Sequence, residues 1–130
     1  MVIFPVGNDP RIITGTYHTA VGSAQQRNYG LAGGCDAAGG TSQTVGWAVA
    51  FEPPDADKPE PSTCAWSGQL HETAPDGSPL EFIASTWVLT SASDAADDWE
   101  STQVGKNYFF RNPPTPDQLN RAISLIRQRR

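Results

Sequence analysis

The segment Gly46-Trp47-Ala48-Val49-Ala50-Phe51 decides the fold class of this chain, because its side chains alternate as they do along a β-strand. Three further segments carry a tryptophan in the same kind of pattern: Cys64-Ala65-Trp66-Ser67-Gly68-Gln69, Ser85-Thr86-Trp87-Val88-Leu89-Thr90-Ser91 and Asp98-Trp99-Glu100-Ser101-Thr102. Four large apolar indoles on four such segments are unfavourable if they stay exposed to water. We therefore expect them to converge, either in a packed core or around a small apolar ligand.

Short alternating runs recur along the chain, and clusters of turn residues separate them. They predict strands over residues 2–6, 11–20, 29–35, 43–52, 64–72, 80–91 and 102–111. A tight hairpin is expected at Pro75-Asp76-Gly77, since proline presets φ and glycine accepts a positive φ. Short connections between successive strands predict an all-β fold, an up-and-down antiparallel meander that closes into a barrel.

The predicted strand 80–91 is apolar on both faces. Its two sets of alternating side chains are Ile83, Trp87 and Leu89 with Ser85, and Phe82, Ala84 and Val88. A strand with one solvated face would instead alternate apolar and polar residues. We therefore expect the outer face to be covered, with another subunit as the first candidate for the cover.

The C-terminal segment has the pattern of a helix. Thr115-Pro116-Asp117-Gln118 combines a threonine N-cap, a proline at the first position and a glutamine three residues after the cap. A helix of about 13 residues is expected to dock by the apolar stripe Leu119, Ala122, Ile123 and Ile126. The expected division is a β-barrel over residues 1–112 and a basic amphipathic helix over residues 113–130.

Composition and charge narrow the class of protein. The length of 130 residues suits one domain, and no apolar run approaches the roughly 20 residues of a membrane span. Residues 1–110 hold four basic and thirteen acidic side chains, whereas residues 111–130 hold five arginines and one acid. Such a basic tail is expected to dock on an acidic body; without interleaved aromatics it does not predict nucleic-acid binding. We expect no membrane partner, and no signal peptide is recognised at the start of this sequence.

The few nucleophiles and metal ligands do not form a catalytic or metal-binding pattern. Cys35, Cys64, His18 and His71 show neither zinc-site spacing nor a base placed for a nucleophile, so neither an enzyme nor a metal site is predicted. The two cysteines form a disulfide if the protein is exported, or remain buried thiols. Asp94, Asp97 and Asp98 are read as a solvated loop.

Binding is the function that the residues themselves favour. Trp66, Trp87 and Phe51 would line the mouth of the barrel if their strands alternate as predicted, although core packing explains them equally well. Small hydroxyl residues accompany them: Tyr17, Thr19, Ser23, Ser62 and Thr90. Aromatic walls with a few convergent polar groups are typical of a small-molecule pocket.

These segments resemble the avidin/streptavidin family of biotin-binding proteins. The resemblance runs from about Ile3 to Phe110 and rests on five motifs in the family's order and spacing: residues 14–22 (TGTYHTAVG), 45–51 (VGWAVAF), 66–69 (WSGQ), 85–91 (STWVLTS) and 97–105 (DDWESTQVG). It implies a β-barrel of the avidin type, biotin as ligand with no other cofactor, no enzymatic activity, and self-association as a homodimer or homotetramer. It also implies a secreted or periplasmic protein.

The resemblance also implies a role for each matching residue. Tyr17 matches the donor to the ureido oxygen of biotin, and Thr19 and Asn107 match the acceptors from its two N–H groups. The other matching positions are apolar walls, groups near the carboxylate and neighbours of the bicyclic ring. They are Trp66, Trp87 and Phe51 as walls, Ser23 and Ser62 near the carboxylate, Cys64 and Leu89 beside the ring, and Trp99 as a lid over the neighbouring subunit's site. Trp47 is read as a supporting residue.

Three departures from the family pattern carry further expectations. Met1 stands at the position of a family serine that follows the first strand, so that strand and two ureido-oxygen donors are expected to be absent. Each lost buried hydrogen bond costs about 1–3 kcal/mol, so affinity would fall roughly 10²–10⁴-fold. Cys64 replaces a threonine, which makes Cys35 and Cys64 the disulfide candidate. The third departure is the C-terminal helix. Either this helix or a segment of a neighbouring chain is expected to cover the gap between strands 2–6 and 102–111.

Two functions remain open at this point. The first is biotin binding with weakened affinity. The second is a family-derived oligomeric scaffold whose pocket is vacant, altered or plugged by its own C-terminal tail.

Overall fold

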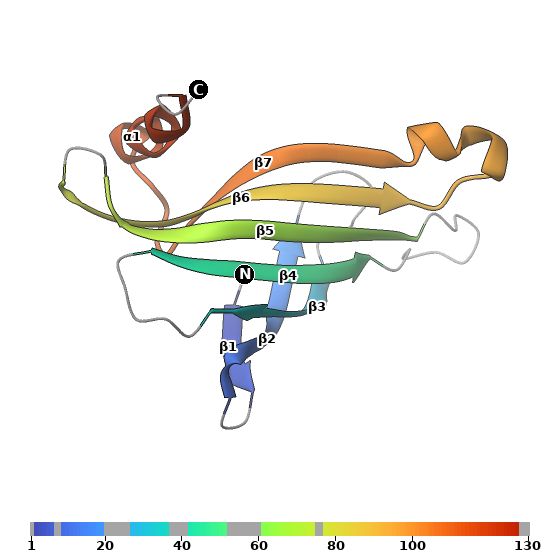
Figure 1. Ribbon diagram of the computed structural model, residues 1–130, viewed down its shortest axis with the longest axis horizontal. Coiled ribbons are helices and arrows are strands. Elements are labelled where there is room, and N and C mark those ends of the chain that lie inside the picture. Colours follow the sequence, from blue (N-terminus) through green and yellow to red (C-terminus); the bar gives the residue numbers. More distant parts are fainter. Residues whose placement is uncertain are drawn as a thin grey trace.

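The computed structural model describes residues 2–6, 9–19, 27–36, 42–51, 61–74 and 77–127. In this part of the chain the elements are β1 (Val2–Val6), β2 (Asp9–Thr19), β3 (Arg27–Cys35), β4 (Ser42–Phe51), β5 (Ser62–Thr73), β6 (Pro79–Ser91), the 3-10 helix η1 (Ala95–Glu100), β7 (Thr102–Phe110) and α1 (Pro116–Arg127). The strands form one antiparallel sheet whose spatial order is the order of the sequence (Figure 1). The predicted all-β, up-and-down meander is confirmed.

The sheet is strongly curled. The ring centroids of Tyr17 on β2 and Trp66 on β5 are 4.9 Å apart, although β3 and β4 lie between these two strands. In a flat sheet strands three positions apart would be separated by about 14 Å. The strands β1 and β2 accordingly run steeply across the direction of β5–β7 (Figure 1). The aromatic rings therefore meet on the concave face of the sheet. Within the described residues β1 and β7 do not pair with each other, so the sheet curls without closing.

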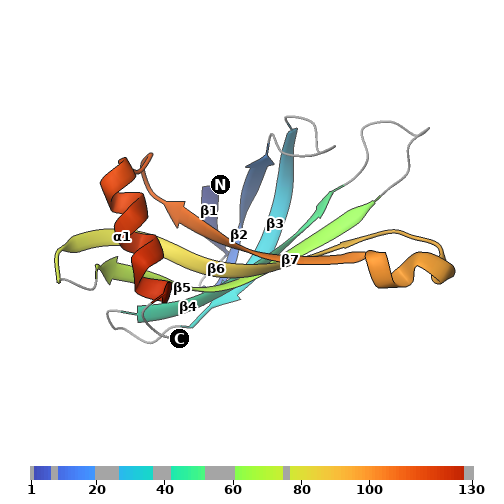
Figure 2. The same cartoon turned by 90° about the horizontal axis from the view of Figure 1, so that it is seen from above.

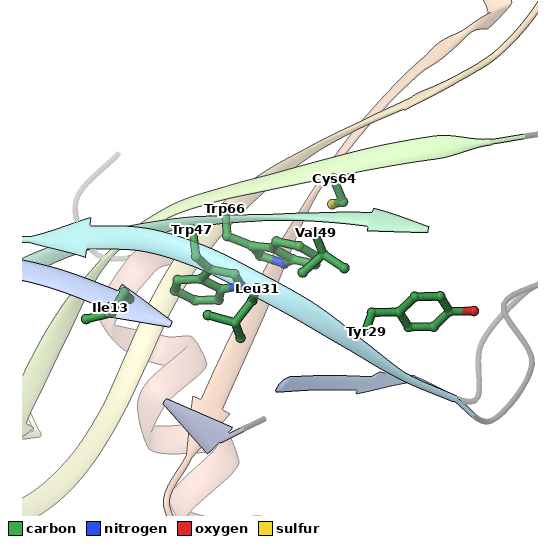
Figure 3. Close-up of a cluster of buried hydrophobic side chains, with 7 residues drawn as sticks. All are labelled: Ile13, Tyr29, Leu31, Trp47, Val49, Cys64 and Trp66. Atoms are coloured by element: carbon green, nitrogen blue, oxygen red, sulfur yellow. The ribbon is translucent and has the colours of Figure 1, made fainter. Parts of the chain in front are cut away.

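The register places the main core on this concave face. Trp47, Trp66 and Trp87 lie directly opposite one another on β4, β5 and β6. The buried cluster around them comes from β2 to β5 and consists of Ile13, Tyr29, Leu31, Trp47, Val49, Cys64 and Trp66 (Figure 3). Gly33 allows the close approach of β3 and β4, because a Cβ there would lie 2.0 Å from the Gly46 carbonyl oxygen.

The hairpin between β5 and β6 follows its predicted turn chemistry. Gly77 has a φ of 80°, the left-handed conformation that glycine adopts without strain. The Gly77 amide donates to the Ala74 carbonyl at 2.9 Å, and the Ala74 amide donates to the Ser78 carbonyl at the same distance. The glycine therefore sets the position at which the chain reverses.

The segment around Trp99 is not the strand that its alternation suggested. Residues Ala95–Glu100 form η1 instead, with the Asp97 amide bonded to the Asp94 carbonyl and the Ser101 amide bonded to the Asp98 carbonyl. Trp99 is 77% exposed, so no packed neighbour holds it in an extended conformation. The three aspartates are exposed, as expected for a solvated segment.

Helix α1 begins at the predicted capping box. The Thr115 hydroxyl accepts from the Gln118 amide at 3.2 Å, and the Gln118 side chain accepts from the Thr115 amide at 3.0 Å. Both bonds satisfy amides that the first helical turn leaves without partners. No helix in the described part of the chain is long and apolar enough to cross a membrane.

The docking position of α1 corrects two expectations. Ala122 is fully buried in a second cluster with Ala74, Leu80 and Phe82. Since Phe82 alternates with Ile83, this cluster lies on the convex face, and α1 crosses one end of β6 in Figure 2. The helix covers the outer face of β6 rather than the gap between β1 and β7. At one end of β6 the outer face is therefore covered by α1 of the same chain. From the sequence, another subunit was expected there.

We predict that Ala122→Asp undocks α1, because a carboxylate would be placed among apolar side chains at a cost of about 1–3 kcal/mol. Trypsin should then cleave after Arg121 at least about tenfold faster than in the wild type. Asn120→Asp adds the same charge two residues earlier at an exposed position and is the matched control. Equal cleavage rates for the two variants would contradict this docking.

Candidate ligand-binding site

A row of aromatic side chains crosses the concave face. Tyr29 contacts Phe51 at a centroid distance of 4.9 Å, and Phe51 contacts Tyr17 at 6.1 Å. Tyr17 contacts Trp66 at 4.9 Å, and Trp66 stacks on Trp47 at 5.7 Å with an angle of 12° between the rings. These residues come from β2, β3, β4 and β5, so their meeting depends on the curl of the sheet. They give the concave face an apolar, flat-sided surface suited to a small ring.

One polar group is held at the Trp66 end of this row. The Trp66 indole N–H donates to Asn107 Oδ1 at 3.1 Å, across the intervening strand β6. The Ser85 hydroxyl donates to the Asn107 backbone carbonyl at 3.3 Å. A carbonyl oxygen has two lone pairs, so Asn107 Oδ1 retains the capacity to accept a second hydrogen bond.

Trp87 is held flat against β7 by the glycine opposite it. A Cβ on Gly105 would lie 2.3 Å from Trp87 Cζ2 and 2.8 Å from its Nε1. The register pairs Trp87 with both Trp66 and Gly105, which places its half-buried indole on the concave face beside the aromatic row. The sequence Val104-Gly105 thus provides the space for one wall of the site.

Two titratable groups in the site are kept neutral. Burial raises the pKa of the Cys64 thiol to about 11. Burial also raises the pKa of Tyr17, and a charge on Cys64 would raise it further. Tyr17 therefore keeps its hydroxyl proton at neutral pH and can act as a hydrogen-bond donor. Cys64 is a thiol there and behaves as a small apolar side chain.

Of the two alternatives for Cys35 and Cys64, the structure has the thiols and not the candidate disulfide. Cys35 lies opposite Val45, whereas Cys64 lies opposite Val49 on the other side of β4. Four residues of strand correspond to about 13 Å, and the two cysteines also lie two strands apart. This separation exceeds the roughly 7 Å between Cα atoms that a disulfide tolerates. The sequence offered the two cysteines as a disulfide candidate but did not show their separation along the sheet.

The structure brings most of the predicted binding residues onto one face. Cys64 and Trp66 are buried, while the others are half-buried on the concave side: Tyr17, Phe51, Ser62, Trp87, Leu89 and Asn107. Ser62 lies opposite Phe51 and Ser91, and Leu89 lies opposite Cys64. Thr90, on the other face of β6, is exposed. These placements follow from the period-two alternation of the strands.

One predicted residue, Trp99, does not lie on this face, and the side chains of two others lie outside the described residues. Trp99 lies on η1, exposed to solvent. The backbone of Thr19 ends β2 opposite Arg27, while its side chain lies outside the described part of the chain. Ser23 also lies outside the described residues. Their predicted roles remain predictions.

Sequence reasoning missed Tyr29 as a candidate. Tyr29 lies directly opposite Tyr17 and is 7% exposed. The alternation of Tyr29 with Leu31 was visible in the sequence, but only the register shows that the two tyrosines are neighbours. Phe109, whose ring meets Trp47 at 5.3 Å, was missed for the same reason.

A shallow hollow at the other end of β3 and β4 is a separate feature. It is lined by Gly34, Cys35, Asp36, Thr44, Val45, Gly46 and Ser67. The Asp36 carboxylate there accepts bonds from the amide and the hydroxyl of Thr44, at 2.9 and 2.7 Å. Asp36 thus fastens the end of β3 to β4 and does not mark a ligand site.

Comparison with known protein families adds an independent finding. The model of the avidin family matches residues 1–112. The matched region takes in all the described strands of the sheet and ends before α1.

We predict that Cys64 is alkylated slowly at neutral pH. In a Cys35→Ser background, the rate with iodoacetamide should rise about tenfold per pH unit between pH 8 and 10, because only the thiolate reacts. It should level off near pH 11, whereas the chain unfolded in urea should level off near the ordinary value of 9.0. The folded state holds this proton more tightly, so Cys64 destabilises the fold as pH rises from 9 towards 11. A native rate that levels off near pH 9 would contradict the assigned burial.

Proposed function

This chain belongs to the avidin family, whose members are non-enzymatic biotin binders, and we propose that it binds biotin on the concave face of its sheet. The observation that carries the proposal is the contact of Tyr17, Trp66 and Asn107. Tyr17 touches Trp66 at 4.9 Å, and Trp66 bonds to Asn107 at 3.1 Å. A neutral hydroxyl donor and an amide acceptor thus flank one apolar indole, as a fused ring carrying a urea group requires.

We assign the polar atoms of the ligand to these groups. Tyr17 donates to the ureido oxygen, while Asn107 and Thr19 accept from the two ureido N–H groups. Ser62 and Ser23 serve the carboxylate. The apolar contacts with the ring come from Phe51, Cys64, Trp66, Trp87 and Leu89. The contacts among Tyr17, Phe51 and Trp66 support the apolar part of this assignment.

The proposed affinity is low for a member of this family. The assignment gives the ureido oxygen one donor, Tyr17, where the family pattern has three. Within the described residues the sheet does not close between β1 and β7, which leaves this region of the concave face unwalled. Each missing buried hydrogen bond costs about 1–3 kcal/mol, which corresponds to an affinity lower by roughly 10²–10⁴-fold in all.

The alternative of a pocket plugged by the C-terminal tail finds no support in the position of α1. The helix packs on Leu80 and Phe82, on the face of the sheet opposite to the aromatic row. A scaffold with a vacant or altered pocket is the remaining alternative. It is distinguished from the proposal by the absence of biotin binding.

We predict that calorimetric titration detects biotin binding and that Asn107→Ala weakens it about 10- to 100-fold, since the variant removes one acceptor and releases the Trp66 indole. Lys106→Ala is the matched control, because Lys106 faces the convex side and donates to the Thr86 hydroxyl at 2.9 Å. The absence of both heat and a thermal shift at millimolar biotin would reject the proposal.

Self-association is proposed as a second property of the chain, as a homodimer or homotetramer. Val88 and Val104 lie opposite each other on the convex face, beyond the part that α1 covers, and are 42% and 68% exposed. Trp99, 77% exposed, lies in the segment that joins these two strands. An exposed apolar surface of this kind is typical of a protein interface. We assign Trp99 to the site of the neighbouring subunit.

Val104→Lys should therefore weaken self-association at least about tenfold, because it places a charge at the centre of the proposed interface. Ile12→Lys is the matched control, since Ile12 is also an exposed branched apolar residue, 45% exposed, but lies on β2. Sedimentation equilibrium at several concentrations measures the effect. If the apparent molar mass of Val104→Lys equals that of the wild type at every concentration, β6 and β7 do not form the interface.

A further inference from the structure

Tyr29 carries a buried hydroxyl that the described part of the protein does not satisfy. The residue is 7% exposed, and its hydroxyl has no hydrogen-bond partner among the described residues. Buried side-chain hydroxyls are nearly always bonded, because leaving one unpaired is costly. Such a group on a candidate binding face points to a partner supplied by the ligand.

The position of Tyr29 fixes which part of a ligand it can reach. Tyr29 lies opposite Tyr17, and both rings contact Phe51 edge-on, Tyr29 at 4.9 Å and Tyr17 at 6.1 Å. Tyr17 leans instead towards Trp66. In Figure 3 the ring of Tyr29 extends away from Trp47 and Trp66, with its hydroxyl towards the start of β3. The ring of Tyr29 therefore extends away from the indole that Tyr17 contacts.

The contacts link a series of side chains on the concave face. The series leads from Asn107 through Trp66, Tyr17 and Phe51 to Tyr29. If biotin binds with its ureido group between Asn107 and Tyr17 and its aliphatic chain over Phe51, its carboxylate would lie beside Tyr29. A carboxylate only accepts hydrogen bonds, and a neutral phenol donates strongly to it.

We propose that the Tyr29 hydroxyl donates a hydrogen bond to the carboxylate of the bound ligand and selects for a free acid at that end. This inference rests on the proposed biotin-binding function and adds a residue to it. The edge-on contact with Phe51 holds the ring of Tyr29 in place before a ligand binds.

The test compares biotin with biotin methyl ester by calorimetry. Tyr29→Phe removes only the hydroxyl and keeps the ring against Phe51. It should weaken biotin about 10- to 100-fold, because a charge-assisted bond is lost, and weaken the methyl ester by less than about threefold. Tyr17→Phe should weaken both ligands by similar factors. Tyr108→Phe, on the convex face beside α1, is the matched control and should change neither.

A stability measurement separates a ligand contact from a structural role. Without ligand, Tyr29→Phe should melt at the wild-type temperature or above it, because no protein hydrogen bond is lost. A lower melting temperature would show a partner within the protein and would overturn the inference. Wild-type biotin affinity in Tyr29→Phe, or equal losses for biotin and its ester, would overturn it while leaving biotin binding intact. No binding by the wild type would overturn the proposed function and this inference together.

Discussion

The curl of the sheet is the constraint on which the rest of the structure depends. Strand alternation alone puts Tyr17 and Trp66 on one face, but in a flat sheet they would be about 14 Å apart. Their rings are 4.9 Å apart because the sheet bends around them. Gly33 and Gly105 permit the close approaches that go with this bend, since a Cβ at either position would collide with its neighbour across the strand. The core and the candidate site are therefore products of the same curvature.

The sequence predicted most of the local structure because its signals were local. The strand limits agree with the structure to within about two residues, and the capping box at Thr115 and the positive φ of Gly77 are confirmed. The family was also predictable, since its motifs cover the part of the chain that the family model matches. The face on which each candidate binding residue of the strands lies followed from alternation alone.

The features that the sequence could not predict depend on where residues lie along each strand and around the curled sheet. The sequence offered Cys35 and Cys64 as a disulfide candidate without showing that they lie on either side of β4, four residues apart along it. The apolar stripe of α1 predicted docking, but it did not show that Ala122 would pack against Phe82 on the convex face. Trp99 alternates like a strand residue and yet lies on η1, because local turns compete with an extended conformation that nothing packs against. Tyr29 could be identified as a neighbour of the candidate site only from its register with Tyr17.

The strand order has a consequence for the time course of folding. Every strand pairs with its neighbours in the sequence, so the sheet can grow one hairpin at a time without closing a long loop. The contacts that form the candidate site instead join residues that are distant in the sequence. Trp66 and Asn107, for example, are 41 residues apart. Such distant contacts carry a larger entropic cost of loop closure than a hairpin does. The meander can thus form before the contacts of the concave face, and a ligand bound at the candidate site would favour the formation of these distant contacts.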